Sequence, residues 1–70
     1  NLIVNLKGSA DHLLHAAKEA TKVNNLKALK DISEEMIYRK ENRILKGKPP
    51  NKRLNKYIDA VLEYKKSLET

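Results

Sequence analysis

Apolar residues recur every three or four positions in three segments of this 70-residue chain, and two short polar interruptions separate the segments. This spacing places the apolar side chains on one face of a helix, so each segment is predicted to be an amphipathic helix. The interruptions are Asn24-Asn25 and the stretch from Gly47 to Asn51, which contains two prolines. The sequence therefore predicts three helices, over about residues 2–22, 26–46 and 52–69.

The first segment admits two starting points. Its apolar stripe continues across Gly8, which favours one helix from about Leu2 to Lys22 although the glycine costs roughly 1 kcal/mol relative to alanine. The alternative begins the helix after Ser9, whose hydroxyl can accept a hydrogen bond from a free backbone N–H of the first turn. Residues 1–8 would then form a separate extended arm. The stripe consists of Ile3, Leu6, Ala10, Leu13, Ala17 and Ala20.

The other two helices have recognisable ends. The pair Asn24-Asn25 is predicted to cap the second helix and Asn51 the third, because a short amide side chain satisfies free N–H groups at a helix start. Gly47 lies where a helix C-terminus favours a left-handed residue. The second stripe consists of Leu26, Leu29, Ile32, Ser33, Met36, Ile37 and Ile44. The third consists of Leu54, Tyr57, Ile58, Val61, Tyr64 and Leu68.

Short connections between long helices favour antiparallel neighbours. The predicted fold is therefore all-α, an antiparallel up-down-up three-helix bundle with short connections in a single domain over residues 1–70. The chain has no cysteine, so no disulfide and no thiolate zinc site can reinforce so small a core. The predicted core residues are Leu13, Leu29, Ile32, Met36, Ile58 and Val61, with Ala10 and Ala17 also buried.

Basic residues gather around the second interruption. Eight of the fifteen lie between Arg39 and Lys56, where Glu41 is the one acid, so this stretch carries +7 while the whole chain carries +6. Clustered cations at one end of a bundle can bind phosphates or an acidic protein surface, and the alternative is a solvated turn. We expect Arg43, Lys48, Lys52 and Arg53 to be exposed. The candidate binding residues are Arg39, Lys40, Arg43, Lys46, Lys48, Lys52, Arg53 and Lys56.

Two apolar residues fall on the outer side of the second helix. Tyr38 and Leu45 lie one heptad apart, opposite the predicted core stripe. Exposed apolar residues on one helix face can mark a partner surface, although isolated ones are ordinary. Tyr38 and Leu45 are therefore a second candidate interface.

The chain has no recognisable catalytic arrangement. It lacks cysteine, and its serines and threonines have no evident base beside them. The acidic pair Glu34-Glu35 is predicted to form ion pairs with Lys30 and Arg39 rather than to do acid–base chemistry. A slim bundle also offers little concavity for a small-molecule pocket. We expect a protein that is not an enzyme and has no cofactor.

Metal binding has little support. His12 and His15 lie on one outward face, and Asp11, His15 and Glu19 are spaced four apart. Such spacing allows either a weak surface metal site or simple ion pairs. A solvated face is the favoured interpretation, and no metal is expected.

These features favour a small interaction module, such as an adaptor, an inhibitor or an immunity-type protein, that binds a protein partner through a helix face and the basic end. The second hypothesis is a nucleic-acid-binding domain that contacts phosphates. A helix-turn-helix is disfavoured, because the connection is longer than the usual turn of about 3–4 residues. The third is a structural or self-associating bundle. No apolar run approaches the roughly 20 residues that cross a membrane, so no membrane role is expected.

Overall fold

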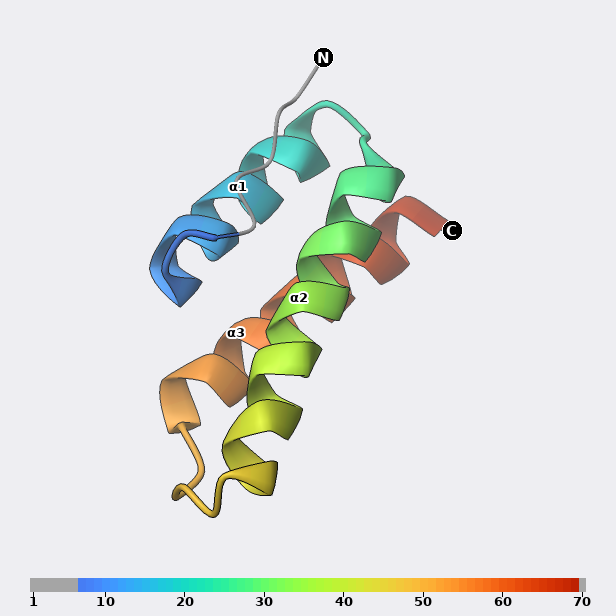
Figure 1. Cartoon of the computed structure of the whole chain (residues 1–70). Coiled ribbons are helices and arrows are strands. Elements are labelled where there is room, and N and C mark those ends of the chain that lie inside the picture. Colours follow the sequence, from blue (N-terminus) through green and yellow to red (C-terminus); the bar gives the residue numbers. More distant parts are fainter. Residues whose placement is uncertain (1–6, 70) are drawn as a thin grey trace.

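The computed structural model describes residues 7–69, which form three helices. They are α1 (Ala10–Lys22), α2 (Leu26–Leu45) and α3 (Lys52–Glu69). Successive helices run in opposite directions, and each packs against both of the others (Figure 1). No residue from 7 to 69 lies in a strand. The predicted all-α three-helix bundle is confirmed.

Helix α1 begins at Ala10, so the continuous helix predicted over residues 2–22 is wrong over residues 7–9. Ser9 is extended, and its Oγ accepts a hydrogen bond from the backbone N–H of His12 at 3.2 Å. Gly8 lies so close to His12 that an added Cβ would stand 2.7 Å from the imidazole ring. The serine cap therefore fixes the start of α1. The rest of the alternative arm, residues 1–6, lies outside the described residues.

Each helix–helix connection has a residue in the left-handed conformation at its second position. Asn24 has a φ of 56° after α1, and Gly47 has a φ of 71° after α2. At the first connection, the N–H of Asn25 reaches back to the carbonyl of Ala20 at 2.8 Å. This hydrogen bond satisfies a carbonyl that the end of the helix would otherwise leave free.

The two asparagine caps are confirmed. Asn25 Oδ1 accepts from the backbone N–H of Ala28, and Asn51 Oδ1 accepts from that of Leu54, each at 3.1 Å. Helices α2 and α3 therefore start within a residue of the predicted positions.

The core contains residues from all three helices. Ala17 is fully buried as predicted, whereas Ala10 is only half-buried against the edge of the core. All six of the large residues predicted to be in the core are buried, so the predicted core is confirmed. They are Leu13, Leu29, Ile32, Met36, Ile58 and Val61.

The apolar stripe of α2 is not buried at its far end, where Ile44 is 66% exposed instead of lying in the core. Helix α1 has 13 residues and α2 has 20, which correspond to about 20 Å and about 30 Å. The short connection places the end of α1 beside the start of α2, and the two helices are antiparallel. The shorter α1 therefore covers only the first part of α2. The last turns of α2 and the turn into α3 extend beyond it (Figure 1).

Candidate functional site

The part of the α2–α3 pair that extends beyond α1 carries a hollow of about 190 Å³. Its lining combines apolar side chains with cations and side-chain amides, and it contains no acid. The lining residues are Lys40, Arg43, Ile44, Lys48, Pro50, Asn51, Leu54 and Asn55. We call this feature the end hollow, and we call residues 39–56, which surround it, the basic end.

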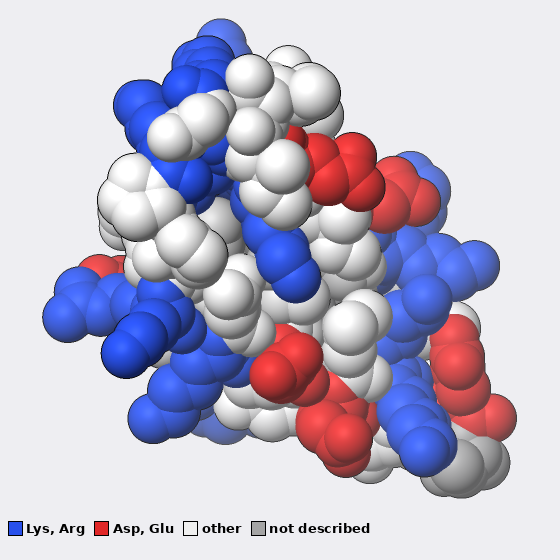
Figure 2. All heavy atoms as spheres, turned by 90° about the horizontal axis from the view of Figure 1, so that it is seen from below, with Lys and Arg blue, Asp and Glu red and all other residues white. Residues whose placement is uncertain are grey.

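The charge of the basic end is not one continuous surface. Seen from this end, Lys and Arg side chains lie on several sides of an uncharged surface, and Asp and Glu side chains form separate groups (Figure 2). A ligand that covers this end would therefore contact both cationic side chains and the uncharged surface between them.

The structure divides the eight predicted basic residues into three groups. Those that line the end hollow are Lys40, Arg43 and Lys48. Those that are exposed outside its lining are Lys46, Lys52 and Lys56. Those that form ion pairs with acids are Arg39 and Arg53.

The ion pair predicted for Arg39 is confirmed. Its Nε lies 2.7 Å from Glu35 Oε2, and the two side chains are only 27% and 26% exposed. An arginine whose Nε is held by a carboxylate one helical turn away is less available to a partner. Of the two predicted binding residues that pair with an acid, Arg39 is therefore less accessible than Arg53, whose side chain is 70% exposed.

Arg43 is half-buried, so the expectation that it is exposed is wrong. The turn after Gly47 brings the carbonyl of Pro49 back toward the last turn of α2, and Arg43 Nη2 donates to it at 2.8 Å. Arg43 Nε is shielded from solvent and forms no hydrogen bond with any residue from 7 to 69. Arg43 therefore braces the turn and also lines the end hollow.

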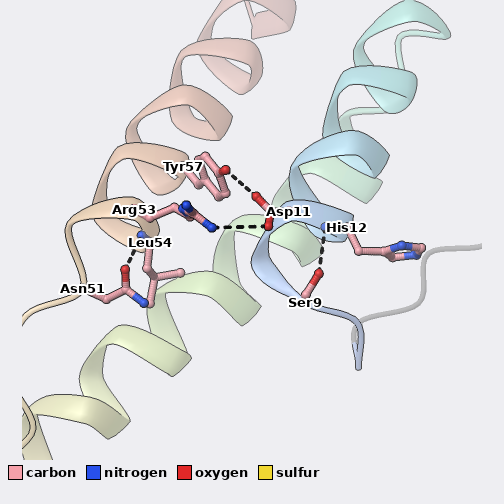
Figure 3. Close-up of polar contacts among 7 residues, drawn as sticks. All are labelled: Ser9, Asp11, His12, Asn51, Arg53, Leu54 and Tyr57. Carbon is pink, nitrogen blue, oxygen red and sulfur yellow. Dashed lines mark hydrogen bonds and ion pairs between the residues drawn. The ribbon is translucent and has the colours of Figure 1, made fainter.

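A tether between α1 and α3 lies beside the basic end. Asp11 accepts a hydrogen bond from the hydroxyl of Tyr57, and its other carboxylate oxygen lies 3.7 Å from Arg53 Nη1 (Figure 3). Tyr57 packs against the core as predicted, but its hydroxyl reaches Asp11. Arg53 and Asp11 are 70% and 62% exposed, so their ion pair contributes little by itself.

The tether predicts a dependence of stability on alkaline pH. The hydrogen bond to Asp11, more than partial desolvation or the charge of Asp11, raises the pKa of Tyr57 above its ordinary value of 10.0, while Arg53 lowers it. Because the pKa is raised in the folded state, the stabilisation is complete below pH 10 and is lost as the pH rises through the folded value. We expect Tyr57→Phe to lower the melting temperature at about pH 8 and to differ less from wild type at about pH 11.

The control for this prediction is Tyr38→Phe, which removes the hydroxyl of an exposed tyrosine in α2. Its difference from wild type should stay constant across the same pH range. The two variants and the wild type are compared at the same pH, so that only the difference between them is interpreted. A Tyr57→Phe effect that does not change with pH would show that the tether does not contribute.

The two histidines remain on the outer face of α1. Both are exposed, and His12 points away from Asp11 (Figure 3). Asp11 faces α3 instead of pairing with His15. Within residues 7–69, no three His, Cys, Asp or Glu side chains are arranged to hold a metal ion.

Tyr38 and Leu45 are 59% and 83% exposed, as their positions on the helix predict. Their surroundings differ, however. Tyr38 lies in a shallow depression of about 220 Å³ with Asp31, Glu34 and Glu35, whereas Leu45 is the last residue of α2 at the basic end. The two residues therefore do not share one uniform surface.

Sequence reasoning missed the apolar part of the end hollow. The prediction places Ile44 on the apolar stripe of the second helix, and it gives Pro50, Asn51 and Asn55 no part in a binding site. The Ser9 cap is the sequence signal that could have found it. A first helix that starts after Ser9 has 13 residues, against 20 in α2, and therefore leaves the end of α2 uncovered.

No helix between residues 7 and 69 combines the length and the apolar character needed to cross a bilayer. Comparison of the chain with protein-family models, with curated protein sequences and with solved structures gives no match, so the function must be inferred from the molecule itself.

Proposed function

We propose that this protein is a small non-enzymatic interaction module that binds an acidic protein partner through its basic end. An adaptor, an inhibitor or an immunity-type protein would act in this way. The observation that carries the proposal is the end hollow, where apolar side chains and three cations lie together on a part of α2 and α3 that α1 leaves uncovered. Exposed apolar atoms with polar residues around them mark protein interaction surfaces.

The same end supports nucleic-acid binding less well. A nucleic-acid backbone presents phosphates at regular intervals and favours an uninterrupted basic groove. Here uncharged atoms divide the cations (Figure 2). The lining of the end hollow contains no aromatic side chain on which a base could stack. A partner with both acidic and apolar side chains matches these features better.

Removing four lysines from the basic end should weaken partner binding by at least about tenfold at low salt, mainly through slower association. Lys46, Lys48, Lys52 and Lys56 are all exposed, and none forms an ion pair with a described residue. Their joint replacement by glutamine should therefore leave the fold intact. Immobilised protein would be used to capture partners from the native lysate after nuclease treatment, with association rates measured on the captured protein.

The matched control replaces four exposed lysines elsewhere, namely Lys18, Lys27, Lys30 and Lys66. Both variants have a net charge of +2 instead of +6, so only the position of the lost charge differs. The proposal requires that the control keep the partner and that the basic-end variant lose it. Equal loss in both would indicate a general charge effect, and capture abolished by nuclease would indicate a nucleic-acid partner. Either result would contradict the proposal.

A further inference from the structure

We infer that the end hollow binds one partner carboxylate that has an aliphatic side chain beside it, and that Arg43 recognises the carboxylate. This inference rests on the proposed function and specifies the chemistry of the partner. It also distinguishes recognition by directed hydrogen bonds from attraction to a diffuse positive charge.

The size of the hollow favours a side chain over a small-molecule ligand. Its volume of about 190 Å³ is below the roughly 300–1,000 Å³ typical of small-molecule pockets. Ile44, Pro50 and Leu54 supply apolar contact on its lining, and the side chain of Ile44 is already 66% exposed. Covering Ile44 with an aliphatic side chain would remove that apolar surface from water.

The polar lining favours an anion. Lys40, Arg43 and Lys48 all line the hollow, and no acid does. Asn51 uses its side-chain oxygen to cap α3, so its side-chain amide N–H groups remain as donors beside these cations. The lining thus offers several donors and full positive charges to an acceptor.

Arg43 is the residue of the lining best suited to bind both oxygens of a carboxylate. A guanidinium has five N–H donors in a planar fork, and the structure shows one of its nitrogens, Nη2, bound to Pro49 at 2.8 Å. Its Nε is shielded from water without an acceptor among residues 7–69. An unpaired buried donor is unfavourable. A carboxylate that draws the guanidinium toward the hollow and accepts from Nε would relieve this, and it would form a bidentate pair that lysine cannot form.

The test uses isotope-labelled protein and blocked tripeptides, followed by nuclear magnetic resonance. Acetyl-Leu-Glu-Leu-amide should shift the signals of the end hollow, including the Nε–H of Arg43. Acetyl-Leu-Gln-Leu-amide and acetyl-Gly-Glu-Gly-amide should each bind at least about fivefold more weakly, since each lacks one half of the recognised pair. Inorganic phosphate serves as the probe for simple anion attraction. Phosphate binding as tight as the first tripeptide, or equal binding of the glutamate and glutamine tripeptides, would overturn the inference.

Arg43→Lys and Arg53→Lys make the same substitution inside and outside the hollow. Arg43→Lys should weaken the glutamate tripeptide about tenfold, the loss of one charge-assisted hydrogen bond, while Arg53→Lys should leave it unchanged. Arg43 also braces the turn, so a second variant is needed to separate peptide binding from the structure of the turn. Ile44→Ser is suitable because Ile44 is exposed. This variant should weaken binding of acetyl-Leu-Glu-Leu-amide and not that of acetyl-Gly-Glu-Gly-amide. Equal behaviour of the two arginine variants, or no effect of Ile44→Ser, would exclude the assigned roles.

The two proposals can fail separately. If the tripeptides do not bind in the hollow but the basic-end lysine variant loses its protein partner, the proposed function stands and this inference is wrong. If the lysine variant keeps its partner at full strength, the proposed function is wrong whatever the tripeptides do.

Discussion

Replacing Leu29 by alanine should lower the free energy of unfolding by about 3 kcal/mol, within the roughly 2–5 kcal/mol typical of buried leucines. Leu29 has no exposed surface and lies in the core formed by all three helices. The substitution removes apolar contacts and leaves a cavity that a slim bundle fills only in part. A 70-residue domain has a total stability of about 4–10 kcal/mol, so this one change would remove a large share of it. Chemical denaturation followed by circular dichroism measures the effect.

Leu45→Ala is the matched control, because it makes the same change in the same helix at a side chain that is 83% exposed. It should change the free energy of unfolding by less than about 0.5 kcal/mol. The ratio between the two effects tests which face of α2 points inward. Similar losses at both positions would mean that the core has been assigned to the wrong face.

The core and the caps were predictable because each depends on residues close together in the sequence. A stripe such as Leu29, Ile32 and Met36 identifies the buried face without knowledge of the neighbouring helices. Asn25 and Asn51 cap their helices through the backbone N–H three residues later, which is also a local relation. Local signals of this kind agreed with the final fold.

The start of α1 was mispredicted because two local signals disagreed. The apolar stripe continues across Gly8, which favours a helix that includes it, whereas Ser9 can cap the N-terminus of a helix that starts at the next residue. The structure shows the cap in place and Gly8 in close contact with the ring of His12. Neither the period nor the cap alone indicates which conformation has the lower free energy.

The end hollow depends on that same choice. With α1 shortened, the last turns of α2 have no helix over them, and Ile44 is exposed next to cations instead of lying in a core. The fold of the turn then places the carbonyl of Pro49 within reach of Arg43, six residues earlier. The sequence predicted the basic charge of this end, but the combination of that charge with an apolar hollow follows from helix lengths and the turn.

Enlarging Ala17 to leucine should destabilise the protein by about 1–3 kcal/mol, although it adds apolar surface to the core. Ala17 has no exposed surface and lies one helical turn after Leu13 in α1, which packs against both other helices. Protein interiors are close-packed, so the added carbon atoms must push a helix away or adopt an unfavourable rotamer. A helix as short as α1, with 13 residues, has few other contacts to compensate for such a shift.

Lys18→Leu is the control for a leucine at a neighbouring exposed position, and it should change stability by less than about 0.5 kcal/mol. The double variant Leu13→Ala/Ala17→Leu sharpens the test, because it keeps the total side-chain volume on the buried face of α1 while moving it by one turn. Volume-conserving changes in a core are tolerated better than single ones, so the double variant should lose less stability than the sum of its two parts. If Ala17→Leu alone instead raises the midpoint of chemical denaturation, space is available beside Ala17, and the helices do not approach closely there.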